Sequence, residues 1–250
     1  MLPLISVIIP VYNHAHTLKR SIESIFRQTH RSLEVIVVND GSTDNFDEVI
    51  KIVNARSEAT KQSLEIKIIT QPNQGAPAAR NKGFAISKGE YVIFWDADTL
   101  AQPKMLEKMF IALQKNPDAA YAYSQFKFGW KKIKSQLFDA NKLKQVNYID
   151  VTSLIRRPAI NCHPELVSGS KCPFDTSLKR FQDWDLWLSM LEQGKTGIFI
   201  PEVLYEKVVG SRDGISTWLP RFVYQLPWKT KQVKKYDSAR SIILKKHHLS

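Results

Sequence analysis

Short, mainly apolar runs alternate with amphipathic segments along the first half of the chain. The apolar runs cover residues 4–9, 33–38 and 91–95, and each of them contains β-branched side chains. Such a run is typical of a strand that is buried on both faces of a parallel sheet. Residues 64–70 alternate between polar and apolar positions, which predicts a fourth strand nearer the sheet edge.

Between these runs, apolar residues recur every three or four positions, which is the spacing of one face of an α-helix. The apolar positions of the predicted helices are Leu18, Ile22, Ile25 and Phe26, then Phe46, Val49, Ile50 and Val53, and later Leu106, Met109, Phe110 and Leu113. A further helix is expected from Pro77 to Lys88, because proline fits the first turn and Gly89 ends the helix. The alternation of strands and helices predicts an α/β protein with right-handed crossovers.

Polar side chains follow three of the predicted strands. Tyr12 comes after the first strand, Asp40 after the second, and Asp96 and Asp98 after the strand at residues 91–95. Because parallel strands point the same way, these side chains should share the sheet edge at which α/β proteins bind ligands. Two carboxylates one residue apart suit a Mg²⁺ or Mn²⁺ ion that takes its other ligands from water and substrate phosphates. A solvated Asp-Ala-Asp turn is the alternative.

The segment NQGAPAARN at residues 73–81 is a candidate phosphate-binding element. Its small residues allow the backbone to approach a ligand, and Arg80 can pair with phosphate. An ordinary helix start with a solvated Arg80 is the alternative. No G-x-G-x-x-G follows a strand and no G-x-x-x-x-G-K-[ST] occurs, so the sequence argues against a dinucleotide-binding Rossmann site and a P-loop.

The composition of the chain is strongly basic. The 250-residue chain carries a formal net charge of +12 and has a pI of about 9.6, which favours anionic partners. Its two cysteines do not make a disulfide framework. No apolar run approaches the ~18 residues of a membrane span, and the first residues do not resemble a secretory signal. We therefore expect a cytoplasmic protein.

Residues 218–250 are expected to form a basic tail. From residue 220 onward the chain has eight Lys or Arg and one acidic residue, and its histidines His247 and His248 are expected to be solvated. The aromatic residues at the start of the tail are Trp218, Phe222, Tyr224 and Trp228. Aromatic residues among cations suit peripheral attachment to an anionic membrane, here the inner face of the cell membrane. Stacking on nucleic acid bases and a tail that packs on the domain are alternatives.

Five sequence blocks occur in the order found in family 2 glycosyltransferases. They are SVIIPVYN at 6–13, VNDGSTD at 38–44, GAPAARN at 75–81, WDAD at 95–98 and QDWDLW at 182–187. The chain resembles this family over residues 4–216. The resemblance implies a GT-A fold, with a mixed, mostly parallel sheet flanked by helices. It also implies a nucleotide-sugar donor, a divalent cation (Mn²⁺ or Mg²⁺) and inversion at the anomeric carbon.

The resemblance further implies roles for individual residues around the donor. Pro10 and Tyr12 would line the nucleoside pocket, and Asp40 would hydrogen-bond the base. Arg80 and Asn81 would border the nucleotide.

The same resemblance implies which residues would bind the metal and which would act as the catalytic base. Asp96 would lie beside the ribose and the metal, and Asp98 would be the direct metal ligand on the diphosphate. Asp183 falls on the family's catalytic base, where aromatic neighbours would raise its pKa by desolvation. A simple helix N-cap is the alternative for Asp183, and Asp185 is expected inside the first helical turn.

The match to the family is weaker in the second half of the chain. Gln182 stands where the family usually has Glu, and Cys172-Pro-Phe-Asp175 replaces a Gly-Gly-Phe-Asp element. Residues 204–211 lack the His that some members carry near the metal, so no His ligand is assigned. A degenerate GT-A domain that binds a nucleotide or glycan without turnover is therefore the alternative to an enzyme.

The sequence as a whole predicts a metal-dependent inverting glycosyltransferase. The donor would be a nucleotide sugar, with UDP the family's commonest base, and the acceptor a glycan or lipid-linked molecule of cell-surface polysaccharide synthesis. The predicted domain covers residues 1–217, with a donor half at 1–100 and an acceptor half at 101–217, followed by the tail at 218–250. No nucleic acid partner is predicted, because a basic nucleic-acid-binding module would leave the carboxylates at the sheet edge unexplained.

Overall fold

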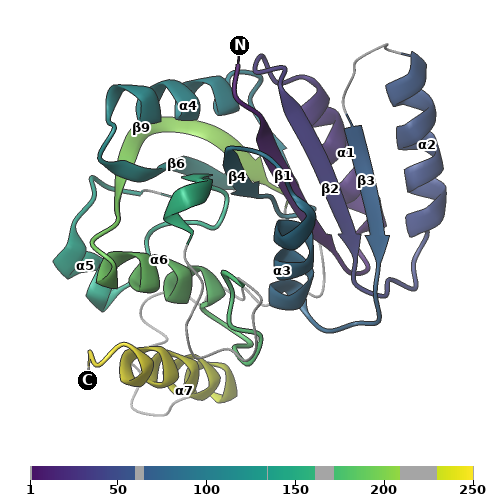
Figure 1. Ribbon diagram of the computed structural model, residues 1–250. Helices are drawn as coiled ribbons and strands as arrows, with labels where there is room; N and C mark the ends of the chain where they lie inside the picture. The colour runs from purple at the N-terminus through teal and green to yellow at the C-terminus, as the bar shows by residue number, and fades with distance from the viewer. Residues whose placement is uncertain (1, 60–64, 134, 161–171, 209–229, 250) are drawn as a thin grey trace.

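A computed structural model describes residues 2–59, 65–133, 135–160, 172–208 and 230–249. They form a mixed sheet with helices on both faces (Figure 1), in the strand order β3-β2-β1-β4-β8-β6-β9-β5, with β7 paired to β6. The α/β class predicted from the alternation of runs is confirmed. The aromatic positions 218–228 of the tail lie outside the described residues.

The first four strands along the chain are all parallel and contain the predicted apolar runs. They are β1 (Ile5–Val11), β2 (Leu33–Asn39), β3 (Glu65–Thr70) and β4 (Tyr91–Phe94). The predicted edge position of the strand at 64–70 is confirmed, because β3 ends the sheet order. The connecting helices are α1 (Ala15–Phe26), α2 (Phe46–Ala59) and α3 (Ala76–Ile86).

Both faces of these central strands are buried, which explains why their sequences are apolar at consecutive positions. Val7 of β1 packs into a cluster with residues of α1, α2 and α4 (Met105–Lys115). The next residue, Ile8, packs into a second cluster with residues of α3 on the opposite face. Successive side chains of a strand point to opposite faces, so each strand supplies two cores.

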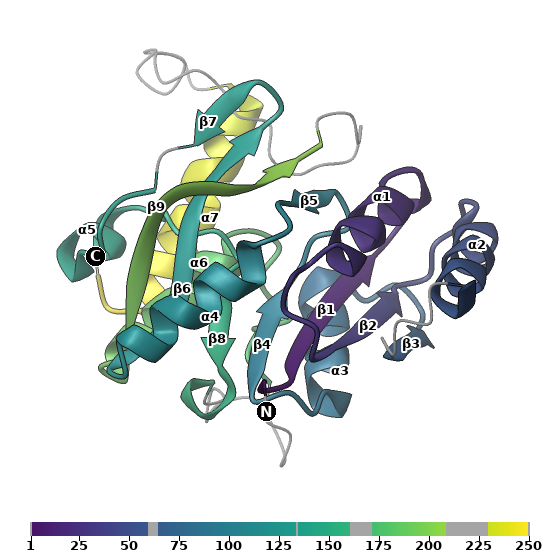
Figure 2. The ribbon, with the colours of Figure 1, turned by 90° about the horizontal axis from the view of Figure 1, so that it is seen from above.

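The second half of the chain extends the sheet with mixed strand directions. Strand β4 pairs antiparallel with β8, β8 pairs antiparallel with β6, and β6 pairs parallel with β9. The bounds are β5 (Thr99–Ala101), β6 (Ala119–Phe128), β7 (Lys131–Ile133), β8 (Leu154–Arg156) and β9 (Thr196–Lys207). The long strands β6 and β9 run side by side beneath α4 in Figure 2. Strand β9 returns to pair with β5 directly after the Asp96–Asp98 turn, which brings the end of β9 to the site.

Three further helices and a short 3₁₀ turn complete the described fold. They are α5 (Ala140–Gln145), the turn η1 (Arg157–Ala159), α6 (Gln182–Glu192) and α7 (Lys231–Lys246). The C-terminal helix α7 lies beside α6 (Figure 1) and buries Ile243 in the same core cluster as the Trp184 and Trp187 side chains. None of the described helices is long and apolar enough to cross a membrane.

The expectation that His247 is solvated is wrong. Its ring is buried, with Nε2 at 2.9 Å from Oδ1 of Asp185 and Nδ1 at 2.7 Å from Oε1 of Glu192. The packing of α7 against α6 places this histidine over two carboxylates that are far away in the sequence. Burial alone lowers the pKa of His247, but the two carboxylates outweigh it and raise that pKa above its ordinary value. His248 is exposed, as expected.

Candidate active site

The polar residues after β1, β2 and β4 meet at one edge of the sheet, as the pattern predicts. Strands β2 and β4 both pair parallel with β1, so Asp40 and Asp96 lie at the same carboxyl edge. Tyr12 lies just beyond the end of β1 and is 46% exposed, whereas Pro10 is inside that strand. An exposed ring at this edge is available for stacking on a planar ligand.

Asp40 organises the loop that leads from β3 into α3. Its buried carboxylate accepts hydrogen bonds from Gln71 Nε2 at 2.8 Å, Gln74 N at 2.9 Å and Gly75 N at 2.7 Å. Gly75 has a φ of 89°, a backbone conformation that favours glycine. A carboxylate has about four acceptor positions, so one remains for a donor group on a ligand. Asp40 therefore fixes the loop and keeps one acceptor position for a further hydrogen bond.

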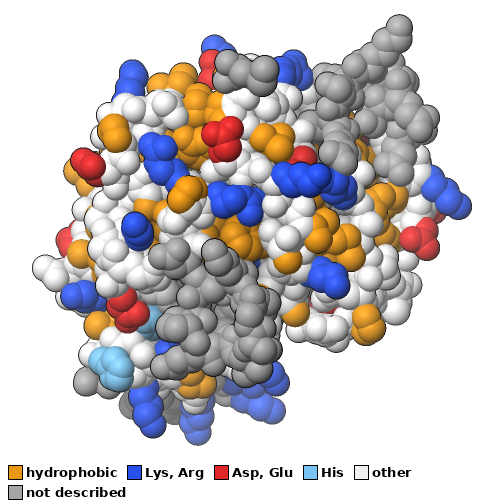
Figure 3. All heavy atoms as spheres, in the orientation of Figure 1, with side chains coloured by type: hydrophobic (Ala, Val, Ile, Leu, Met, Phe, Trp, Pro, Cys, Tyr) orange, Lys and Arg blue, Asp and Glu red, His pale blue; other side chains and the backbone are white. Residues whose placement is uncertain are grey.

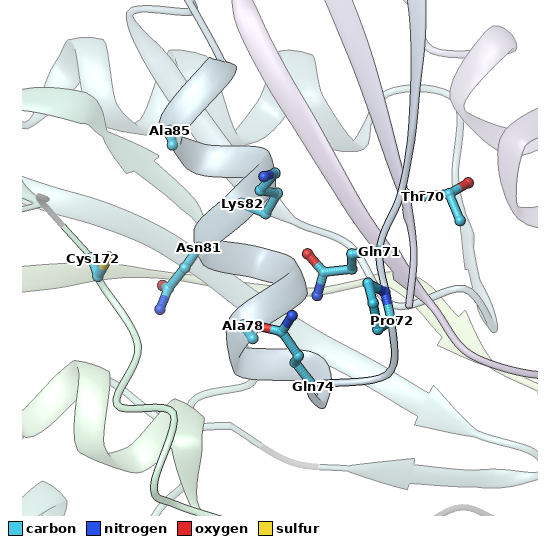
Figure 4. Close-up of a pocket in the computed structure, with 9 residues that line it drawn as sticks. All are labelled: Thr70, Gln71, Pro72, Gln74, Ala78, Asn81, Lys82, Ala85 and Cys172. Carbon is cyan, nitrogen blue, oxygen red and sulfur yellow. The ribbon is translucent and has the colours of Figure 1, made fainter. Parts of the chain in front are cut away.

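An open pocket of about 440 Å³ lies between this loop and α3 (Figure 4). Gln71, Gln74 and Lys82 line it with polar side chains, and Cys172 lies on its far side in the close-up. Asn81 also lines the pocket, but its amide is engaged in two hydrogen bonds with the backbone of Phe174, at 2.8 and 3.0 Å. Asn81 thus joins α3 to the segment around Phe174, and its border role at the nucleotide stays a prediction.

Arg80 connects the carboxyl edge of the sheet with the start of α6. Its Nη2 lies 2.9 Å from Oδ1 of Asp96, and its Nη1 donates to Oε1 of Gln182 at 2.9 Å. The guanidinium also stacks over the ring of Phe174, 5.3 Å from its centroid. Its buried Nε has no hydrogen-bond partner among the described residues. Gln182, which stands where the family usually has Glu, therefore contacts Arg80 without carrying a charge. The positive charge of Arg80 is paired with Asp96.

Two residues that the sequence reasoning missed complete the centre of the site. Lys207, at the end of β9, places its Nζ 2.8 Å from Oδ2 of Asp96 and 2.6 Å from Oδ2 of Asp150. Burial raises the pKa of Asp96, but the charges of Lys207 and Arg80 outweigh it and hold that pKa well below its usual range. A charge at the end of an apolar strand was the signal that singled out Asp96, whereas the strand of Lys207 also contains Glu202 and Glu206 and gives no such signal.

Asp98 follows Asp96 in the turn between β4 and β5. Burial raises the pKa of Asp98 to about 6, the negative charges of Asp96 and Asp150 add to this effect, and Lys207 offsets part of it. The negative charges around the carboxylate of Asp98 are thus not fully balanced by positive ones. The described residues contain no group of three or more His, Cys, Asp or Glu side chains arranged to hold a metal. A divalent cation fits Asp98 only if water and donor phosphates supply most of its ligands, which is how Mg²⁺ commonly binds.

Asp183 lies in the first turn of α6. Phe181 is the N-cap of that helix, in a left-handed conformation with φ 58°, so the N-cap alternative for Asp183 is wrong. Oδ2 of Asp183 accepts a hydrogen bond from Asn147 Nδ2 at 2.6 Å. Burial raises the pKa of Asp183, and the charge of Asp150 raises it further. The role of Asp183 as the catalytic base stays a prediction.

Asp185 is unsuited to that task, although it lies only two residues further along α6. Its carboxylate is fully buried and bonds to Lys246 Nζ at 2.9 Å and to His247 Nε2 at 2.9 Å. These contacts hold α7 against α6. Asp185 is thus a structural anchor, and Asp183 is the carboxylate left for the site.

Comparison with known proteins identifies the family. The sequence model of Glycosyl transferase family 2 matches residues 6–163. The chain belongs to glycosyltransferase family 2. This glycosyltransferase is 27% identical to the uncharacterized glycosyltransferase MJ1057 of Methanocaldococcus jannaschii, over 92% of the chain and 81% of the relative. It is 30% identical to the uncharacterized glycosyltransferase RT0329 of Rickettsia typhi, over 98% of the chain and 72% of the relative. The uncharacterized glycosyltransferase YibD of E. coli is 38% identical over 50% of this chain and 35% of that protein.

Superposition on solved structures of glycosyltransferases confirms the GT-A fold of this chain. The chain superposes on S. aureus TarS in complex with UDP-GlcNAc with a TM-score of 0.67 at 17% identity, over 97% of this chain and 72% of that one. It superposes on the mannosyltransferase PcManGT of Pyrobaculum calidifontis in complex with GDP-Man and Mn²⁺ with a TM-score of 0.64 at 20% identity. That match covers 97% of this chain and 70% of the other.

Proposed function

We propose that this protein is a metal-dependent, inverting glycosyltransferase that moves a sugar from a nucleotide sugar to a glycan or lipid-linked acceptor in cell-surface polysaccharide synthesis. One observation carries the proposal. Asp150 contacts Lys207, which contacts Asp96, and the charge of Asp150 acts on both Asp98 and Asp183. The carboxylates at the donor edge and the raised-pKa carboxylate of α6 thus belong to one site, as a transfer reaction between two substrates requires.

The donor would bind across the carboxyl edge of β1, β2 and β4. The ring of Tyr12 and the neighbouring Pro10 would flank the nucleoside, and the remaining acceptor position on Asp40 would take an N–H of the base. Arg80 would sit beside the phosphates. The structural neighbours in complex with UDP-GlcNAc and GDP-Man support a nucleotide sugar as donor, and UDP is our first choice of nucleotide.

The metal would be Mn²⁺ or Mg²⁺, held by Asp98 with help from Asp96. A divalent cation supplies positive charge to the departing diphosphate when it is bound. The raised pKa of Asp98 supports this assignment, because a dication would remove the excess of negative charge around that carboxylate. The neighbour in complex with Mn²⁺ supports the same class of ion.

Asp183 would act as the general base. The acceptor oxygen forms a bond to C1 of the sugar while the bond from C1 to the phosphate oxygen breaks. The electron pair leaves with the diphosphate, and the proton of the acceptor hydroxyl passes to Asp183. Attack from the face opposite the leaving group inverts the configuration at C1. The hydrogen bond from Asn147 fixes the orientation of the Asp183 carboxylate.

Transfer from a radiolabelled nucleotide sugar tests this function. UDP- and GDP-linked sugars are first screened by thermal shift with and without Mn²⁺, because a donor at 100-fold excess over its Kd adds about 2.7 kcal/mol of folding stability. The stabilising donor is then offered with glycan and lipid-linked acceptors, and the anomeric configuration of the product is determined. A retained configuration contradicts the direct inverting mechanism.

The second candidate function is donor or glycan binding without turnover. Gln182 in place of the family's Glu, and the absence of a His at positions 204–208 of the described chain, favour it. Stabilisation by a nucleotide sugar without transfer or hydrolysis on any acceptor would support this candidate.

We also propose that the C-terminal helix attaches the enzyme to an anionic membrane surface. Figure 3 shows Lys and Arg side chains gathered at the end of the molecule where α7 lies. The exposed residues of α7 include Lys231, Lys234, Lys235 and Lys245. Each cation near an anionic lipid surface contributes about 1 kcal/mol, and salt screens this attraction.

A further inference from the structure

Lys207 is a cation built into the centre of the site. Residue 207 is paired with Thr99 in the sheet, and the neighbouring Val208 N donates to the backbone oxygen of Asp98 at 3.0 Å. The side chain is only 11% exposed and lies against the ring of Phe126, with Nζ 5.6 Å from its centroid. The position of the ammonium is therefore set by a strand pairing and by an aromatic wall, in addition to its ion pairs.

The bonding of the ammonium is incomplete. An ammonium group has three N–H donors. Among the described residues it has two hydrogen-bond acceptors, Oδ2 of Asp96 at 2.8 Å and Oδ2 of Asp150 at 2.6 Å. A buried charge normally has all its hydrogen bonds made. Since the described part of the chain supplies no third acceptor, the remaining N–H is available to a ligand.

The charges around Lys207 indicate what that acceptor is. The ammonium of Lys207 lies within hydrogen-bond distance of two carboxylates, those of Asp96 and Asp150. Asp96 also pairs with Arg80, so it does not need Lys207 for its neutralisation. Lys207 lies between Asp96 at the edge of the sheet and Asp150, and a phosphate oxygen is an anionic acceptor that matches its remaining N–H.

We propose that Lys207 is a ligand of the donor diphosphate. The third N–H of its ammonium binds a phosphate oxygen of the nucleotide sugar, and it stabilises the negative charge that this oxygen gains as the sugar bond breaks. Lys207 thereby supplies part of the positive charge that the leaving group needs, independently of the metal at Asp98. This inference rests on the proposed function, because it concerns the same donor.

The proposal is tested by the affinity for nucleotide diphosphates relative to monophosphates. Lys207→Met keeps the aliphatic stem and removes the charge, and Lys207→Arg keeps the charge. Lys108→Met is the matched control, because Lys108 forms its ion pair with Glu202 on the surface, away from the site. Calorimetry measures the binding of UDP, UMP, GDP and GMP to each protein, with Mn²⁺ and with EDTA.

We expect Lys207→Met to lower the affinity for the preferred diphosphate about tenfold or more in EDTA, and to change that for its monophosphate less than twofold. Lys207→Arg should recover most of the loss, and Lys108→Met should behave like the unchanged protein. Equal losses for diphosphate and monophosphate overturn the proposal. An unchanged diphosphate affinity with a higher Mn²⁺ affinity also overturns it, and would make Lys207 a competitor of the metal.

A second variant covers the case in which Lys207→Met does not fold, because that change leaves two carboxylates without their partner. Lys207→Met combined with Asp150→Asn removes one of these charges, and Asp150→Asn alone is its reference. The same selective loss for diphosphates is expected, and its absence overturns the proposal. If the unchanged protein binds none of the four nucleotides even with Mn²⁺, the proposed function fails as well, whereas binding that is insensitive to Lys207 rejects only this inference.

Discussion

The contact between His247 and Asp185 should be a main determinant of how firmly the C-terminal helix is held. Side chains of Asp185 and His247 are 1% and 3% exposed, so the histidine covers a carboxylate that water does not reach. Removing one partner of a buried ion pair costs about 3–5 kcal/mol, because the other charge stays buried. Lys246 also pairs with Asp185, so we expect the lower end of this range, about 3 kcal/mol, for His247→Asn.

Urea unfolding of His247→Asn and of His248→Asn measures this loss. The second variant is the matched control, since His248 is exposed and its φ of 52° is a conformation that asparagine tolerates. We expect a loss of less than about 0.5 kcal/mol for the control, as for most surface substitutions. For a chain of this size, 3 kcal/mol corresponds to a fall in Tm of roughly 6 °C or more.

The loss in His247→Asn should also depend on pH. The groups that face this histidine are Asp185 and Glu192 on α6, while Lys246 on its own helix also reaches Asp185 and Asp175. Because the folded-state pKa of His247 is raised, its stabilisation is fully present below the unfolded pKa of about 6.5. It is lost as the pH rises through the folded-state pKa. Equal losses at pH 6 and at pH 9, or a loss below about 1 kcal/mol at pH 6, would refute the reasoning.

Three further predictions concern the site and the helix surface. Asp98→Asn should abolish Mn²⁺-dependent donor binding in calorimetry without lowering Tm, because burial already disfavours the charge of this carboxylate; an unchanged donor affinity contradicts the metal assignment. Asp183→Asn should lower kcat by about 10²- to 10⁴-fold with donor affinity retained, and near-normal transfer would dismiss Asp183 as the base. Replacing Lys234, Lys235 and Lys245 by Gln should release the protein from phosphatidylserine vesicles at low salt, whereas unchanged sedimentation would argue against a role of α7 at membranes.

The fold of residues 1–100 could be predicted from the sequence because its signals are local. Strands β1, β2 and β4 are covered on both faces, so apolar residues such as Val7 and Ile8 follow each other directly and mark a strand by themselves. The polar residues that end these strands, Asp40 and Asp96, need only the parallel direction of the strands to meet at one edge. No knowledge of the rest of the chain is required for either step.

The centre of the site could not be found in this way. Lys207 reaches Asp96 across 111 positions of sequence and Asp150 across 57, and nothing in the residues around it indicates these partners. Both contacts exist because β9 passes β6 and pairs with β5, an order that the periodicity of a single segment does not contain. The first and second halves of the chain are therefore brought together around Lys207 by tertiary structure alone.

The environment of His247 could not be predicted from the sequence either. Near the C-terminus, among lysines, His247 has the sequence context of a solvated residue, and only the packing of Ile243 into the core brings it to Asp185. Local sequence determines which residues can form a strand or a helix, because the backbone periodicity acts over a few positions. Whether a charged group is exposed or buried depends on which distant segment covers it, and that was decided by the tertiary structure.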